Sequence, residues 1–436
     1  FPFTFARKIS HICMRILIKN ATLVSPEHPL HGKKTDLFIE DGLIKEIGNN
    51  LSPENTEMIQ QEGLHVSYGW MDCFANFCDP GEEYKETIET GANAAATGGY
   101  TDVMIVPNTA PVVQNKSQID YLITKAIPTP VTVHPIGAAT QNLEGKSLAE
   151  IYDMRDAGAA AFSDGFLPIQ SAGILQKALE YTLAFDGTFI QLPDDKSIGR
   201  YGLINEGVVS TRMGMLGKPA IAEELMVARD IELVKYTKSK IHFTGISTRK
   251  SIELIKKAKK EGLPVTCSVT PYHLFFSDEN LTDYNTMLKV NPPLRTPSDR
   301  DALREAVLDG TVDFIASHHN PQDYDNKVCE FEKAKNGMET LETVFSAIRN
   351  CGIPSDLFVK MQTENIRKVF NLPYYGLKEN TEAVLTLFNP DEPYTYSEKD
   401  LSSQCTNNAF LGIPLTGKVF GTINKDHIFL SFIHKN

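Results

Sequence analysis

Eight short apolar segments alternate with helix-like stretches between residues 69 and 317, and this alternation constrains the fold more than any other feature. Eight β/α units over roughly 250–300 residues match a (β/α)8 barrel. A doubly wound open sheet would give the same alternation, but no glycine-rich phosphate loop follows the first segment, which weakens a nucleotide-binding interpretation. The segments expected as strands are 69–74, 101–106, 131–136, 159–163, 188–192, 240–244, 265–269 and 313–317.

The stretch 219–238 is representative of the intervening helices. Its apolar residues recur at helical spacing, which predicts one buried helix face. The residues expected on that face are Ile221, Leu225, Ala228, Ile231 and Val234.

Both ends of the chain have the alternating apolar and polar pattern of strands rather than barrel units. At the N-terminal end, Asp41-Gly42 separates two such runs and predicts a tight hairpin, because glycine tolerates the positive φ of the turn. The two ends are therefore expected to pair into one small β module. The expected strands are 14–24, 37–39, 43–47, 383–388, 417–423 and 427–432.

Composition limits the classes of function. The chain has 436 residues and a net charge of −12, which argues against nucleic acid or an anionic membrane as a partner. No apolar run approaches the ~18 residues of a membrane-spanning helix. The seven cysteines are scattered, without a C-x-x-C pair, which is typical of free thiols in a reducing cytoplasm. We interpret residues 1–13 as an upstream extension, because the first strand pattern begins at Met14.

Several motifs occur in an order that resembles the dihydroorotases, a family of cyclic-amide hydrolases. The segment 69–81 (GWMDCFANFCDPG) is similar to the family's first-strand motif at Gly69, Asp72, Phe77, Pro80 and Gly81. The other similar segments are 106–109 (VPNT), 158–165 (GAAAFSDG), 289–295 (KVNPPLR) and 313–321 (DFIASHHNP).

The resemblance implies a (β/α)8 TIM barrel of the metal-dependent amidohydrolase type with a small composite β-sandwich made from both termini. On that basis we expect residues 14–66 with 378–436 to form the sandwich and residues 67–377 to form the barrel. The reaction implied is the reversible cyclisation of carbamoyl-aspartate to dihydroorotate, in which zinc activates water and polarises the amide. Its site would lie at the carboxyl ends of the barrel strands.

Most positions that would hold the metal carry side chains that cannot bind it. Zinc takes imidazole, thiolate or carboxylate ligands. Among the six family positions, only the strand-4 carboxylate keeps its type. In chain order these positions are Phe74, Asn76, Asp164, Gln191, Gly245 and His318.

The substrate-binding positions implied by the resemblance are partly retained. Cys78 stands where the family has an arginine that grips the substrate carboxylate, and cysteine cannot replace that cationic fork. Gln322 stands at a histidine position. Asn108, Asn291 and Arg295 match, although Arg295 could also brace the Pro292-Pro293 turn.

Other reactive side chains have both a functional and a structural interpretation. Asp164 with His318 could form a residual metal site, and Cys78 could be a nucleophile if a base lay beside it. We favour a hydrogen-bonded histidine and a buried inert thiol. His273 and Asp72 are expected to be structural, and Asp194-Asp195 to be a solvated acidic loop.

Three hypotheses about function follow. The leading one is a dihydroorotase-family protein of pyrimidine biosynthesis without the metal centre or any other cofactor, acting as a structural or regulatory partner of aspartate carbamoyltransferase. The second is an active cyclic-amide hydrolase with a remodelled site, which alone would require zinc. The third is a non-catalytic module that binds a pyrimidine precursor. In each case the resemblance implies a homodimer, and the composition indicates the cytoplasm.

Overall fold

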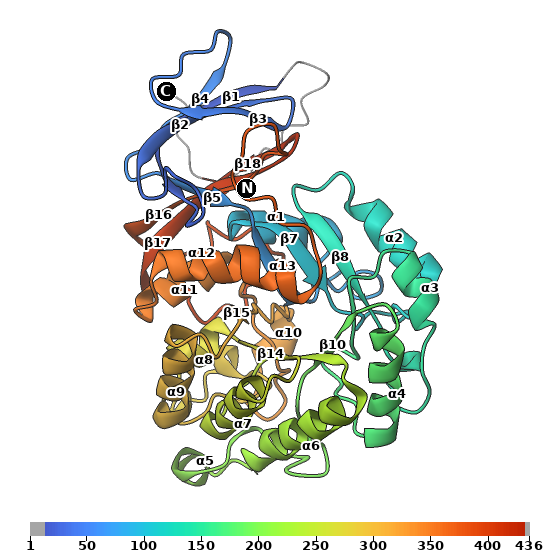
Figure 1. The fold of residues 1–436 in the computed structure, drawn as a ribbon. Coiled ribbons are helices and arrows are strands. Elements are labelled where there is room, and N and C mark those ends of the chain that lie inside the picture. Colours follow the sequence, from blue (N-terminus) through green and yellow to red (C-terminus); the bar gives the residue numbers. More distant parts are fainter. Residues whose placement is uncertain (1–13, 432–436) are drawn as a thin grey trace.

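Eight parallel strands form a barrel in the computed structural model, which describes residues 14–431 (Figure 1). Adjacent strands pair in parallel, as a barrel of β/α units requires. All eight expected strands are confirmed. They are β6 (Trp70–Ala75), β7 (Tyr100–Ile105), β8 (Thr132–Gly137), β9 (Ala161–Phe162), β10 (Thr188–Gln191), β13 (Lys240–Phe243), β14 (Val265–Val269) and β15 (Phe314–Ile315).

The first and last strands are joined beyond their regular ends. Ala75 pairs in parallel with His319, and the Asn76 amide donates to the His319 carbonyl at 2.8 Å. Asp72 is fully buried and accepts from the Ser317 amide at 2.7 Å and the Phe74 amide at 3.1 Å. Asp72 is therefore the structural carboxylate expected from the sequence, and it closes the barrel.

Helices cover the outside of the barrel. The longer ones are α1 (Ile88–Thr97), α2 (Lys116–Ala126), α4 (Ala172–Leu183), α6 (Ile221–Thr237), α7 (Arg249–Lys260), α9 (Pro297–Leu308) and α11 (Val344–Asn350). The shorter ones are α3 (Ile151–Asp156), α5 (Val208–Met213), α8 (Pro271–Phe275), α10 (Tyr324–Lys327), α12 (Ser355–Lys360) and α13 (Ile366–Val369). No helix among residues 14–431 is long and apolar enough to cross a membrane.

The face that α6 buries differs from the one expected. Ile231 and Val234 are buried as predicted, but Ile221 and Leu225 are 47% and 48% exposed. The buried side chains of the first turns are instead Ala222, Glu223, Met226 and Val227. The helical periodicity therefore predicted the helix correctly. At the N-terminal end of α6, the face that packs on the barrel is shifted by about one residue from the expected face.

Strands from both ends of the chain form one continuous second sheet, shown at the top of Figure 1. The expected pairing of the two ends is confirmed, because β5 runs antiparallel to β16. Asp41 and Gly42 both have positive φ and form the predicted hairpin turn. The strands are β1 (Arg15–Val24), β2 (Lys34–Glu40), β3 (Leu43–Gly48), β4 (Glu57–Ile59), β5 (His65–Tyr68), β16 (Val384–Thr395), β17 (Pro414–Asn424) and β18 (His427–Leu430). The expected extension 1–13 and the last expected strand residue, 432, lie outside the described residues.

Each sheet has its own apolar core, and aromatic rings join the two. The ring of Trp70, at the start of the first barrel strand, has its centroid 4.9, 5.0 and 5.2 Å from those of Phe345, Phe358 and Phe388. Phe388 belongs to β16, so this cluster connects the barrel to the small sheet.

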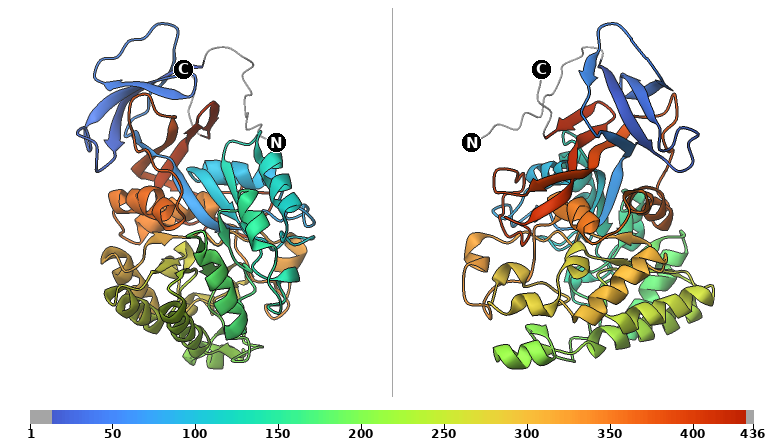
Figure 2. Two further views of the ribbon diagram at one scale, coloured as in Figure 1. Left: turned by 45° about the vertical axis from the view of Figure 1, so that its right-hand side comes forward. Right: turned by 90° about the vertical axis from the view of Figure 1, so that its left-hand side faces the viewer.

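A long excursion (residues 192–220) leaves the barrel between β10 and α6. It contains two short parallel strands, β11 (Ile204–Asn205) and β12 (Gly217–Lys218), with α5 between them. Figures 1 and 2 show α5 at the end of the molecule farthest from the small sheet.

Candidate functional site

The barrel mouth is filled by aromatic rings at two family metal positions. Phe74, at the end of β6, stacks on the His318 imidazole with ring centroids 4.5 Å apart and an interplanar angle of 28°. Phe166 packs edge-on against Phe74 at 5.1 Å. Both Phe74 and His318 are buried, so ring packing occupies the space between the ends of the first and last strands.

The imidazole of His318 also occupies the place of a third family ligand. A Cβ atom built on Gly245 would lie 2.5 Å from the His318 Cε1 atom, which is closer than real Cβ contacts. His318 Nε2 is 2.7 Å from the Thr244 hydroxyl. Burial lowers the pKa of the ring to about 3, so His318 is neutral at pH 7. Gly245 and His318 are therefore complementary in shape, and a histidine could not be added at residue 245 without moving the ring.

Asn76 stands at the second expected ligand position on the first strand, and its side chain forms hydrogen bonds to neighbouring residues. Its carbonyl oxygen accepts from the Cys78 amide at 2.9 Å, and its side-chain nitrogen donates to Asn320 at 3.3 Å. Cys78 itself is buried, and burial raises the pKa of its thiol above the ordinary value. The structure therefore supports the inert-thiol interpretation of Cys78.

Gln191 is turned toward helix α6 and away from the other ligand positions. Its amide donates to the Asp230 carboxylate at 3.2 Å. Burial raises the pKa of Asp230 to about 6, and Arg229 pairs with the same carboxylate at 2.7 Å. The next residue, Leu192, is the one that lies beside Gly245. Neither residue supplies a zinc donor at the mouth.

Asp164, which keeps its type, is held by the end of the neighbouring strand. One carboxylate oxygen accepts from the Ala139 and Thr140 amides at 3.0 and 2.9 Å, and the other accepts from the Thr140 hydroxyl. Burial raises its pKa to about 6, against the opposing effect of these donors. The hydrogen bonds fix Asp164 as a brace between β8 and the loop after β9.

These residues do not fit a zinc ion. A zinc site needs three or four imidazole, thiolate or carboxylate donors that converge on one point. Phe74 and Gly245 offer no donor, and Asn76 and Gln191 offer neutral amides that are already hydrogen-bonded. Among residues 14–431, no three His, Cys, Asp or Glu side chains are arranged to hold a metal.

The retained substrate positions are engaged with the protein itself. Asn108 donates to the Asp164 carbonyl at 3.2 Å and accepts from the Phe166 amide at 3.2 Å. Arg295 is buried and donates to Ser247, Asn205 and the Lys218 carbonyl at 3.0–3.1 Å. Arg295 thus braces the excursion rather than the Pro292-Pro293 turn.

Asn291 and Gln322 lie in similar networks. Asn291 accepts from Lys218 Nζ at 2.8 Å, and Lys218 also pairs with Asp194 at 2.6 Å. Asp194 is buried, so the expectation that it belongs to a solvated acidic loop is wrong. The ion pair with Lys218 compensates the buried carboxylate. Gln322 donates to the Asn336 carbonyl at 3.3 Å, and its side-chain oxygen is buried without a partner in the described structure.

Two other buried histidines are structural. His273 Nε2 lies 3.1 Å from the Pro292 carbonyl, and burial lowers its pKa to about 4. His242 lies between the Thr266 and Ser268 hydroxyls at 2.9 and 3.0 Å. Neither contributes to a site at the mouth.

The sequence alone did not reveal a buried acidic cluster around His319. Its ring nitrogens lie 3.6 Å from the Glu86 and Glu339 carboxylates, and all three side chains are fully buried. Burial raises the pKa of Glu339 and of the neighbouring Glu342. The only signal in the sequence is the spacing of Glu339 and Glu342, one helical turn apart, which does not point to a histidine from another segment.

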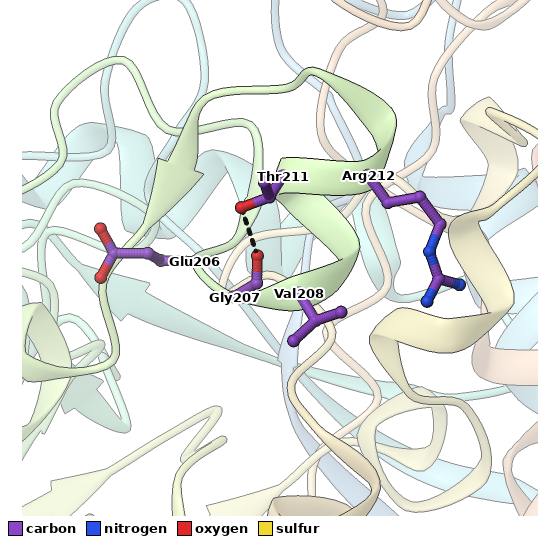
Figure 3. A pocket seen from close by; sticks show the side chains of 5 residues that line it. All are labelled: Glu206, Gly207, Val208, Thr211 and Arg212. Carbon is purple, nitrogen blue, oxygen red and sulfur yellow. Dashed lines mark hydrogen bonds between the residues drawn. The ribbon is translucent and has the colours of Figure 1, made fainter.

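A surface pocket lies on the excursion. It has a volume of about 620 Å³ and is lined by Glu206, Gly207, Val208, Thr211 and Arg212 (Figure 3). None of the family positions contributes to it.

Comparison with known proteins identifies a family. Residues 66–251 match the family described as Dihydro-orotase-like. A protein named dihydroorotase from Acetivibrio thermocellus is 40% identical over 94% of this chain and 97% of its own length. Another of that name from Pelotomaculum thermopropionicum is 39% identical over 94% of this chain and 97% of its own.

Solved structures support the same architecture. The L-hydantoinase of Arthrobacter aurescens superimposes with a TM-score of 0.83 over 95% of this chain and 96% of its own, at 22% identity. At that identity the likeness speaks for the fold alone. The full-length similarity to relatives above 30% identity decides the family, and the chain belongs to the dihydroorotase family.

Proposed function

We propose that this protein is a non-catalytic member of the dihydroorotase family with a structural or regulatory role in pyrimidine biosynthesis. The observation that carries the proposal is the stack of Phe74 on His318 against Gly245. Three positions that would supply metal ligands pack against one another instead.

Filling the metal positions with packed side chains removes the zinc-bound water on which the family reaction depends. Zinc lowers the pKa of bound water from about 15.7 to about 7, which makes hydroxide available at neutral pH. A barrel that cannot hold the metal loses that nucleophile and the polarisation of the amide. The neutral His318 and the hydrogen-bonded Asp164 are not joined by a third His, Cys, Asp or Glu among residues 14–431 in an arrangement that could hold a metal ion.

A role through a partner is the form of this proposal that we favour. Inactive dihydroorotase-like proteins are known as partners of aspartate carbamoyltransferase, and this scaffold retains its fold while its metal positions are filled. Co-purification with the aspartate carbamoyltransferase of the same organism, compared with an unrelated barrel protein, tests the role. The six free cysteines of the described residues agree with action in the cytoplasm.

An active hydrolase is the second candidate, and the names of the relatives favour it over the non-catalytic proposal. Proteins named dihydroorotase reach 40% identity over nearly the whole chain. Such an activity would need ligands other than those at the six family positions, or a mechanism without zinc. A pyrimidine-precursor binding module predicts instead a rise in melting temperature with dihydroorotate and no turnover.

One assay separates these candidates. Conversion of carbamoyl-aspartate and hydrolysis of dihydroorotate are measured with the purified chain in the presence of zinc, and the Acetivibrio thermocellus relative serves as the positive control. The proposal expects no turnover above buffer. Turnover that disappears in the Asp164→Ala variant would contradict it and would establish the hydrolase.

A further inference from the structure

Hydrogen bonds between side chains link His318 to a second histidine, His242, inside the barrel. His318 Nε2 is 2.7 Å from the Thr244 hydroxyl, and the Ser268 hydroxyl donates to Thr244 at 3.0 Å. Ser268 lies 3.0 Å from His242 Nε2, and His242 Nδ1 lies 2.9 Å from the Thr266 hydroxyl. All of these residues except Thr266 are buried. We call these five side chains the polar chain.

The direction of the bond between Thr244 and His318 follows from proton counting. A hydroxyl group carries one proton, and a neutral imidazole has one donor nitrogen and one acceptor nitrogen. Ser268 gives its proton to Thr244 Oγ1, so Thr244 is free to give its own proton to another acceptor. Among residues 14–431, the acceptor that the Thr244 hydroxyl reaches is His318 Nε2. Thr244 therefore donates and His318 Nε2 accepts.

The ring proton of His318 then has one place left. The low pKa of the buried ring keeps it neutral, so it carries a single N–H. Since Nε2 accepts a hydrogen bond, that proton is on Nδ1, because the bond made by one ring nitrogen decides which nitrogen is protonated.

The other end of the polar chain has the same direction. Ser268 has used its proton toward Thr244, so its oxygen accepts from His242 Nε2. Burial lowers the pKa of His242, which leaves this ring neutral as well. Its Nδ1 then accepts from the Thr266 hydroxyl. Donation runs from Thr266 to His318 without a break.

The two nitrogens of His318 are consequently closed to a metal ion. A metal ligand must offer an unshared lone pair, and neutral imidazole has one, on the unprotonated nitrogen. In His318 this lone pair accepts from Thr244. Nδ1 is buried and has no hydrogen-bond partner among residues 14–431. A buried N–H without an acceptor is destabilising, so this atom suits an oxygen acceptor and not a cation.

We propose that the polar chain fixes the His318 proton on Nδ1, which makes His318 a hydrogen-bond donor for an acceptor oxygen and prevents it from coordinating a metal ion. Thr244 is the positioning residue in this proposal, because it contacts the ring directly and receives its own direction from Ser268. The proposal goes beyond the proposed function, since the position of this proton is defined whether or not the barrel turns over substrate.

Nitrogen-15 NMR of the histidine side chains in the full chain tests the proposal. Protonated and unprotonated ring nitrogens have separate signals, and a His318→Gln variant assigns those of His318. The expected wild-type pattern is a protonated Nδ1 and an unprotonated Nε2. Added zinc should shift neither signal. A protonated Nε2 in the wild type, or a zinc-dependent shift of either His318 nitrogen, would overturn the proposal.

His273 supplies a reference of the opposite kind in the same spectrum. Its Nε2 lies 3.1 and 3.2 Å from the Pro292 and Pro293 carbonyls, which only accept, so Nε2 carries the proton. Its Nδ1 lies 2.8 Å from the Thr270 hydroxyl. His273 and His318 should therefore show opposite protonation patterns.

Two matched threonine substitutions test the positioning role. Thr244→Val removes the donor to His318 Nε2, so the ring should exchange between both protonation forms and its two signals should move toward each other. Thr270→Val removes the corresponding hydroxyl at His273, but the two carbonyls should keep the proton on Nε2. Unchanged His273 signals in Thr244→Val show that the variant is folded. A Thr244→Val variant that keeps the wild-type His318 pattern would overturn the role of the polar chain.

Discussion

Replacing Gly245 by alanine tests the packing that fills the barrel mouth. Gly245 has φ of +67°, a conformation that costs an L-residue about 1–2 kcal/mol. The new Cβ atom would also lie 2.5 Å from His318 Cε1, and such overpacking costs about 1–3 kcal/mol. Together these effects predict that Gly245→Ala lowers the free energy of unfolding by about 2–5 kcal/mol.

The two effects are separable with a second substitution. In a His318→Ala background the ring is absent, so the Gly245→Ala penalty should fall towards the backbone cost of about 1–2 kcal/mol, with only the Leu192 Cδ1 contact at 3.1 Å remaining. Gly262, with φ of +76° and no atom near its Cβ direction, is the matched control and should also lose only about that amount.

Urea unfolding followed by fluorescence measures these differences. Trp70 is the only tryptophan, is fully buried and packs between the barrel and the small sheet, so it reports loss of the barrel. A Gly245→Ala penalty that does not change when His318 is removed would refute the proposed contact.

Three further predictions follow from buried polar groups. Arg367→Met should destabilise the protein by about 1.5–3 kcal/mol in urea unfolding, because it removes the guanidinium 2.6 Å from the half-buried Asp102 carboxylate, which keeps His134 as a partner at 2.9 Å. The pKa of Asp102 is lowered in the folded protein, so its stabilising contribution should be present near neutral pH and be lost as pH falls below about 4 in the wild type. Burial lowers the pKa of Lys327 to about 7, so above pH 7 the folded chain binds fewer protons than the unfolded chain. The free energy of unfolding should therefore rise with pH in this range. Thermal melts from pH 7 to 9 should show a smaller rise for Lys327→Met. Peptide mapping after iodoacetamide treatment at pH 8 should find Cys78 unmodified and the partly exposed Cys329 modified, and rapid labelling of Cys78 would contradict its burial.

The sequence predicted the architecture because local patterns determine it. Each barrel strand is a short apolar run, and each begins and ends within two residues of its expected limits. The face of α6 was predicted less well. Helical periodicity shows which residues share a stripe, but Ile221 and Leu225 are exposed because the barrel contacts the neighbouring stripe through Met226.

The contacts at the barrel mouth could not be predicted from the sequence. Motif order predicts that Phe74 and His318 stand at family ligand positions, and that assignment stays a prediction. Their stacking depends on two segments that are far apart in sequence and meet only when the barrel closes. The same holds for Arg295, whose partners Asn205 and Ser247 come from other β/α units. No local pattern encodes such pairs.

Zinc content shows whether the expected ligand positions can still hold a metal ion. The untagged protein is purified without chelator, dialysed against zinc and then against buffer, and analysed by elemental mass spectrometry beside the Acetivibrio thermocellus relative. We expect this chain to retain essentially no zinc, because packed rings and hydrogen-bonded amides occupy those positions. One or more zinc ions held firmly per chain would contradict the non-catalytic proposal and favour the active hydrolase.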